Sequence, residues 1–177
     1  MYKLLLAIVL SVFMFQDNPT MSWRHGYRLQ WSDFEGAPER LNNVVAVTAS
    51  GISFSFSSKT SETKLLDYNF TVKADFYPQE SWCLKDRVTA NILNHERLHF
   101  DITELYARKF RQRIKNTTFT LNISRQMEQL HDAINEELEI MQNAYDAETK
   151  HSQNIEKQKE WQAKIILQLN NLAYYGS

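Results

Sequence analysis

The sequence contains a single cysteine, Cys83, among 177 residues. One thiol excludes an intrachain disulfide, a zinc finger built from cysteines and a CxxC redox site. Glycine and proline are also scarce, with 4 and 3 residues, and the chain has 10 phenylalanines, so a collagen-like or disordered chain is excluded. Neither sign of charge dominates, because 20 Lys and Arg are balanced by 21 Asp and Glu. We therefore expect no nucleic-acid partner, since the overall basic field that attracts one is missing.

A long apolar run stands at the N-terminus, where Leu4–Phe15 follows Lys3 and is interrupted only by Ser11. The run is shorter than the roughly 20 apolar residues that a membrane-spanning helix needs. A basic residue before a short apolar segment is typical of a secretory signal peptide. We therefore expect residues 1–20 to be a signal peptide or an uncleaved N-terminal anchor, with no other membrane contact. Residues 23–177 are then one domain that is secreted or periplasmic.

The hydrophobic period changes once along the chain. Between residues 27 and 77, apolar and polar residues alternate, as at Leu29 and Trp31 and again from Ile52 to Phe56. Such alternation predicts three or four antiparallel strands with one covered face. Beyond Pro78 the period is helical, which predicts three helices. The first spans residues 86–115, the second follows it and ends at about residue 148, and the third begins near Ser152. The order indicates an α+β fold: a small antiparallel sheet followed by three helices packed on one side.

The first predicted helix carries the motif H-E-x-x-H as His95, Glu96 and His99. Histidines at positions i and i+4 lie about 40° apart around a helix, so both imidazoles can bind one Zn²⁺ ion. A catalytic zinc takes three protein ligands and a water molecule, and the glutamate beside the first histidine is placed to act on that water as a general base. The motif therefore predicts one zinc ion per chain and a catalytic role for Glu96.

The third zinc ligand is not fixed by this spacing. A metzincin site needs Gly and His where this chain has Ile102 and Leu105, so that class is excluded. Glu136 and Glu137 on the second predicted helix point away from its apolar stripe. His151, between the second and third helices, is the strongest candidate. His131 is a weaker rival, better explained as a partly buried helix histidine, and Asp146 is a further alternative.

Several segments resemble a bacterial family of unknown function that is described as predicted secreted zinc-dependent proteases. The similarity begins at Leu29–Gly36 and is densest at Leu93–Ile102. Near its end the family pattern Y-D-x-x-T-x-H-G matches Tyr145, Asp146, Thr149 and His151, but this chain has Ser152 in place of the glycine. The resemblance implies that His151 completes a three-histidine zinc site in a zincin-like domain.

These features predict a secreted zinc metallopeptidase that hydrolyses a peptide or protein substrate. Two alternatives stay open: a zinc-stabilised binding module without catalysis, and a zinc hydrolase of a cell-wall amide. Tyr145 is a candidate hydrogen-bond donor to a developing oxyanion, and Asp101 and Asp146 are candidate partners of the ligand histidines. We expect the basic run from Arg108 to Lys115 to be a solvated helix end.

Overall fold

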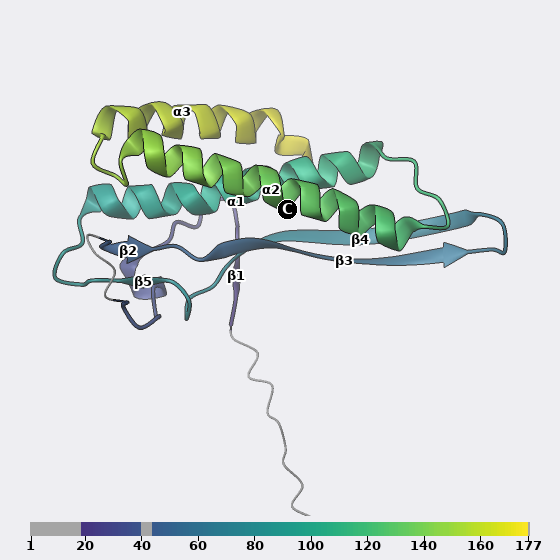
Figure 1. The fold of residues 1–177 in the computed structure, drawn as a ribbon, viewed down its shortest axis with the longest axis horizontal. Helices are drawn as coiled ribbons and strands as arrows, with labels where there is room; N and C mark the ends of the chain where they lie inside the picture. Colours follow the sequence, from purple (N-terminus) through teal and green to yellow (C-terminus); the bar gives the residue numbers. More distant parts are fainter. Residues whose placement is uncertain (1–18, 40–43, 177) are drawn as a thin grey trace, which may run out of the picture.

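The structure, a computed structural model, describes residues 19–39 and 44–176. It has the predicted α+β architecture, with strands first and helices afterwards. A three-stranded antiparallel sheet has the order β1-β4-β3, formed by Met21–Ser22, Leu65–Phe76 and Ser50–Thr60. Three helices lie over one face of this sheet: α1 (Ala90–Asn116), α2 (Ile123–Thr149) and α3 (Ile155–Asn171) (Figure 1). The proposed signal peptide lies almost entirely outside the described residues.

The long β3–β4 hairpin forms where the sequence alternates. Its register pairs Phe54 with Val72 and Phe56 with Phe70, so the apolar side chains of both strands share one face. That face packs on the helices, while the serines between the phenylalanines of β3 are exposed. Of the three or four predicted half-buried strands, these two are confirmed.

A second, two-stranded sheet pairs β2 (Ala46–Val47) antiparallel with β5 (Trp82–Cys83). The chain leaves β2 through Thr48 and Ala49 and enters β3 at Ser50. The predicted strand through Leu29 and Trp31 is wrong. Trp31–Asp33 is instead a short 3-10 helix, η1, in which the Gln30 N–H donates to Asp33 Oδ2 at 2.7 Å. The apolar alternation there reflects single buried side chains in a loop, such as Leu29.

Helix α1 lies at the centre of the fold. It begins after Thr89, whose hydroxyl oxygen accepts a hydrogen bond from the Ile92 N–H at 3.2 Å. It contacts β3, β4, α2 and α3, and every residue from Phe100 to Arg108 is buried. The middle of this helix therefore has no solvated face.

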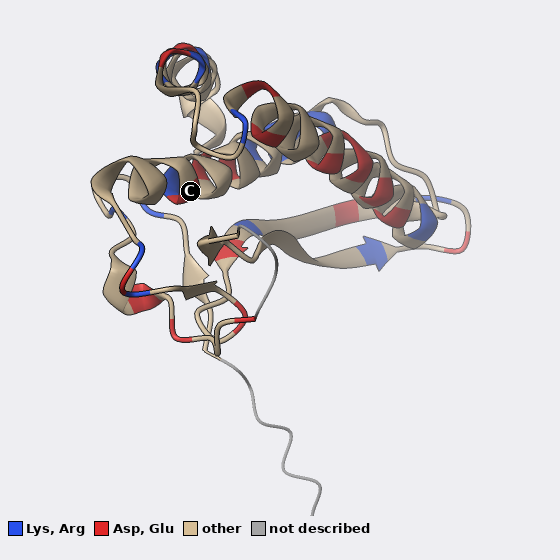
Figure 2. Ribbon diagram, turned by 60° about the vertical axis from the view of Figure 1, so that its left-hand side comes forward, with Lys and Arg blue, Asp and Glu red and all other residues tan. Residues whose placement is uncertain are grey.

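The expectation of a solvated basic run is wrong for Arg108 and Arg111. Both side chains are buried, and both donate to the fully buried carboxylate of Glu104, at 2.8 and 3.1 Å. The hydrophobic period of α1 marks one buried stripe, but α3 and the C-terminal segment cover the opposite side as well. Acidic residues are spread along α2, whereas basic residues are scattered over several elements (Figure 2).

The connection between α2 and α3 has unusual backbone geometry. Lys150, His151 and Ser152 have φ values of 51°, 50° and 71°, which are left-handed. Helix α2 closes with His151 N–H donating to the Asp146 carbonyl at 2.9 Å. Helix α3 begins at Ile155 after the capping residue Asn154, later than the predicted start near Ser152, because a left-handed residue cannot open a right-handed helix. Within the described residues, the helices are too polar or too short to cross a membrane.

Candidate metal centre

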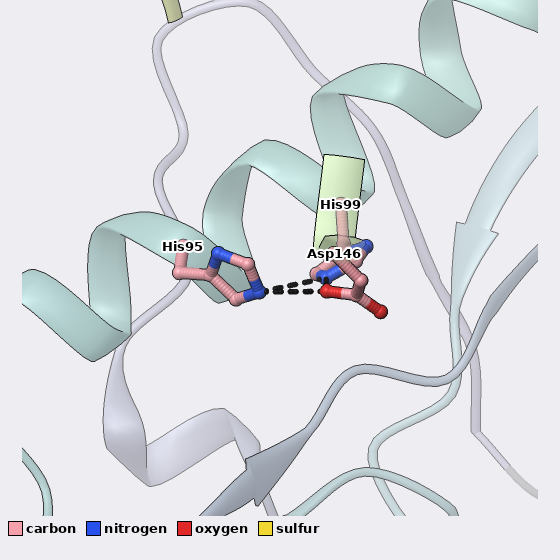
Figure 3. Close-up of side chains that lie close together, drawn as sticks. All are labelled: His95, His99 and Asp146. Atoms are coloured by element: carbon pink, nitrogen blue, oxygen red, sulfur yellow. Dashed lines mark hydrogen bonds and ion pairs between the residues drawn. The ribbon is translucent and has the colours of Figure 1, made fainter. Parts of the chain in front are cut away.

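Helix α1 presents His95 and His99 on successive turns toward α2, where Asp146 lies opposite them (Figure 3). Asp146 Oδ1 is 3.0 Å from His95 Nε2 and 3.1 Å from His99 Nε2. The two Nε2 atoms are themselves 3.1 Å apart. Three potential metal ligands from two helices thus form a nearly equilateral triangle of donor atoms, all within 4.8 Å of one another.

The donor set and its spacing fit zinc. Ligands bound at about 2.0–2.1 Å in a tetrahedron lie roughly 3.3 Å from each other, close to the edges of this triangle. Imidazole nitrogen and carboxylate oxygen are also the donors that zinc prefers when the fourth position is left for water or substrate. Hydrogen bonding between neutral side chains does not satisfy every contact: with Nδ1–H of His99 facing the Gln142 oxygen, Nε2 of a neutral His99 presents a lone pair to the Asp146 oxygen.

Contacts outside the triangle fix the ring of His99. Its Nδ1 faces the side-chain oxygen of Gln142, which leaves Nε2 free to present its lone pair to the centre. The amide nitrogen of Gln142 donates to the His99 carbonyl at 3.0 Å and to the Thr103 hydroxyl at 3.3 Å. His95 Nδ1 is buried and has no hydrogen-bond partner among the described residues.

The pKa values of Asp146 and His99 are shifted in opposite directions. Burial raises the pKa of the Asp146 carboxyl, but the hydrogen bonds with His95 and His99 outweigh burial and hold its pKa well below the usual range. Burial lowers the pKa of His99, yet the hydrogen bond to Asp146 and the charge of Glu96 together raise that pKa above its usual value. Both shifts therefore favour a charged His99 beside an ionised Asp146, and a bound cation would compete with that proton.

Glu96 lies beside this triangle and is 5% exposed. Its Oε2 accepts a hydrogen bond from the Thr48 hydroxyl at 2.7 Å, so the junction between β2 and β3 holds this carboxylate. The negative charge of Glu96 contributes to the shifted pKa values of both His99 and Tyr145. Glu96 is adjacent to His95 in the sequence and is not part of the donor triangle, so its carboxylate is a candidate general base.

Tyr145 lies beneath the two histidine rings. It is fully buried, its ring stacks on His95 with 4.5 Å between centroids, and it meets the ring of His99 edge-on at 4.9 Å. Its hydroxyl donates to the His95 carbonyl at 3.4 Å, and Trp161 packs on its other side. Burial, ahead of the nearby acidic charges, raises the pKa of Tyr145 far above its usual range. This placement favours a packing role for Tyr145 over donation to an oxyanion.

His151 stands at the edge of the site and not inside the donor triangle. Its Nδ1 lies 3.6 Å from Asp146 Oδ1, the oxygen that contacts both other histidines, and 77% of its side chain is exposed. The structure therefore brings Asp146 into the position that the sequence favoured for His151. The spacing of H-E-x-x-H could not decide between them, because both residues lie near the end of α2.

The other candidates lie elsewhere. Asp101 accepts hydrogen bonds from Trp23 and Arg28, and so does not orient a ligand histidine. Glu137 forms an ion pair with Arg113. His131 Nε2 contacts the Ile52 carbonyl at 3.0 Å, as expected for a partly buried helix histidine.

Sequence reasoning missed two residues of the site. Gln142 precedes Asp146 by one helical turn and therefore shares its face of α2, a relation that the sequence contained. Thr48 gave no such signal, because its contact with Glu96 joins segments 48 residues apart.

The comparisons with known proteins concern the family and not the reaction. No curated protein and no solved structure matches the chain. A family model described as "Bacterial protein of unknown function (DUF922)" matches residues 35–152, a segment that contains the donor triangle, Glu96 and His151. The chain therefore belongs to this bacterial family of unknown function.

Proposed function

We propose that the protein is a zinc-dependent hydrolase, specifically a metallopeptidase that cleaves a peptide or protein substrate outside the cytoplasm. One observation carries the proposal: His95, His99 and Asp146 converge to a triangle with edges of 3.0–3.1 Å, and the buried carboxylate of Glu96 lies beside it. The apolar N-terminal segment behind Lys3 supports export of the chain.

In this proposal, one set of residues binds the metal and another residue transfers the proton. His95, His99 and Asp146 would hold one zinc ion, with Gln142 fixing the ring of His99. Zinc, when bound, acts as a Lewis acid toward a scissile carbonyl and lowers the pKa of a coordinated water. Glu96 would accept a proton from the attacking water and pass it to the leaving amine. Thr48 would keep one carboxylate oxygen of Glu96 engaged, so that the other faces the reaction.

The test combines metal analysis with one substitution. Purified protein should contain about one zinc per chain, and it should hydrolyse at least one substrate in a screen of peptides and cell-wall fragments. Glu96→Gln should keep the zinc and the fold while lowering hydrolysis by about 10²–10⁴-fold, the usual range for loss of a general base. Glu62→Gln, at an exposed position in the β3–β4 turn, is the matched control and should leave the rate unchanged. A Glu96→Gln protein that cleaves at the original rate would refute the mechanism, and cleavage of cell-wall fragments alone would favour the amide hydrolase.

A second candidate, the zinc-stabilised binding module, is favoured by a specific contact. His151 Nδ1 lies 3.6 Å from Asp146, so a fourth protein donor stands near the triangle. Four protein ligands would close the coordination sphere, as in structural zinc sites. The module predicts that Glu96→Gln changes no function and that His151 binds the metal.

A further inference from the structure

His151 is too exposed for a typical metal ligand, yet it lies closer to the metal centre than an ordinary surface residue would. The imidazole is 77% exposed and makes no hydrogen bond to the described residues, yet its Nδ1 approaches the oxygen of Asp146 that faces His95 and His99. It is the most exposed of the four side chains, and Asp146, at 31%, is the next. His151 therefore stands on the side from which a ligand enters.

The backbone that carries His151 is fixed on both sides. Ser152 offers its carbonyl to the side-chain amide of Asn91 at 2.7 Å, and Gln158 in turn donates to Asn91 at 3.0 Å. The Asn154 N–H closes the loop onto the Thr149 carbonyl at 2.8 Å. The loop is thus tied to α1, α2 and α3, and the exposed His151 side chain projects from this fixed backbone.

This loop also holds three consecutive non-glycine residues at positive φ, Lys150 to Ser152. This conformation is unfavourable for any residue with a Cβ atom, and strain of this kind persists where the surroundings enforce it, often at functional sites. Here the enforced geometry turns His151 back over Asp146 instead of letting α2 continue away from the metal centre.

We propose that Asp146 is the third metal ligand and that His151 stays outside the coordination sphere, where it donates a hydrogen bond to the oxygen of whatever ligand enters the open position. A carbonyl or carboxylate oxygen of a peptide is the natural acceptor for this donor. This inference deepens the proposed function, and it transfers to His151 the role that the sequence had suggested for Tyr145.

Measurements of zinc affinity can decide whether Asp146 or His151 is the third ligand, without any measurement of activity. In competition with a chromophoric chelator, Asp146→Ala should weaken zinc binding by at least about a hundredfold, as expected for loss of a ligand. His151→Ala should weaken zinc binding by at most about tenfold, because a residue outside the coordination sphere acts on the ion only through a ligand and His151 makes no hydrogen bond to Asp146. His25→Ala, which removes an exposed imidazole elsewhere, is the control. Loss of zinc in His151→Ala with retention in Asp146→Ala would overturn the assignment.

The donor role is tested with acetohydroxamate as an oxygen-donor probe, titrated into the Co²⁺-substituted protein and followed by visible absorption. His151→Ala should weaken probe binding by about tenfold, the value of one hydrogen bond near 1.4 kcal/mol. His151→Gln, which keeps an N–H donor, should recover part of the affinity. An unchanged probe affinity in His151→Ala would refute the donor role. A failure to find hydrolysis in the wild-type protein would instead count against the peptidase proposal, since neither measurement here depends on turnover.

Discussion

Helix α1 carries two buried polar clusters, and they differ in how their groups are satisfied. Toward the C-terminal half, Glu104 faces Arg108 and Arg111, and the arginines also donate to the carbonyls of Leu169 and Val72. Toward the N-terminal half, His95 and His99 face Asp146, and one buried nitrogen, His95 Nδ1, has no partner among the described residues. The carboxylate of the first cluster is surrounded by donors, whereas in the second cluster Nε2 of a neutral His99 faces the Asp146 oxygen with a lone pair.

This difference separates a structural cluster from a candidate binding site. Burying the charge of Glu104 is tolerable because two guanidinium groups surround it with charge-assisted hydrogen bonds. The histidine cluster gains a comparable balance when it holds a proton on His99 or a cation between its donor atoms. The two ends of the same helix therefore respond to different perturbations: one to the loss of a side chain, the other to the loss of an ion.

The largest expected effect concerns the cluster of Glu104, Arg108 and Arg111. Arg111→Ala leaves Glu104 with one charged partner and removes donors from the Val72 and Tyr175 carbonyls. We expect the free energy of unfolding to fall by about 3–5 kcal/mol, the usual cost of breaking a buried ion pair. Urea denaturation measures this. Arg113→Ala, which removes a partly exposed pair with Glu137, is the control and should cost at most about 1 kcal/mol. Equal losses in the two variants would contradict the contrast drawn here.

Removal of the metal should act at the histidine cluster. Zinc that binds the native state alone stabilises it by about 4 kcal/mol when the free metal concentration is a thousand times Kd. Chelation should therefore lower the Tm of the wild-type protein by several degrees and leave that of His99→Ala unchanged. An identical Tm with and without zinc, after metal loss is confirmed by elemental analysis, would exclude an ion that links α1 to α2.

The response to pH should change sign with the metal. In the metal-free protein the pKa of His99 is raised, so this group adds stability below its unfolded pKa and loses it as pH rises through the higher folded pKa. Zinc requires both imidazoles to be neutral, so the zinc-bound protein should instead gain stability over the same range. Each proton involved changes the slope by up to about 1.4 kcal/mol per pH unit. Parallel pH profiles for the two forms would contradict the proposed exchange of a proton for a cation.

The smallest effect concerns the loop that positions His151. Ser152→Gly should relieve the strain at φ 71° and raise the stability by about 0.5–1 kcal/mol, despite the entropy that glycine adds to the unfolded chain. Glu139→Gly, at an exposed position in the interior of α2, should destabilise by a similar amount. A comparison of Tm values tests both. Destabilisation of equal size in the two variants would show that the left-handed geometry carries no strain.

The sequence predicted the elements whose pattern is local. Alternation from Ile52 to Phe56 gave the hairpin, and the helical stripe through His95 and His99 placed both imidazoles in the interior. It failed where burial is set by a distant segment. The period of α1 marks one stripe, so nothing local indicates that α3 and Tyr175 cover Arg108 and Arg111.

The same limit applies to the site. The spacing H-E-x-x-H fixes the relation of two histidines, but the third donor depends on where α2 ends and how its last turn is oriented. The elimination of other candidates and the family resemblance favoured His151. The left-handed turn at Lys150 instead places that residue over Asp146 at the exposed edge of the site, and Asp146 faces α1. Thr48 could not be found at all without the β2–β3 junction in place.

The length of α1 has a consequence for local unfolding. Its 27 residues form one uninterrupted helix, about 40 Å long at 1.5 Å per residue, with a cluster toward each end. Amide hydrogens near His99 and near Arg108 should therefore exchange with solvent through the same cooperative opening, and not through separate local ones. A ligand bound at the histidine end would then slow exchange at the arginine end, so occupancy of the site could be detected far from it by hydrogen-exchange mass spectrometry.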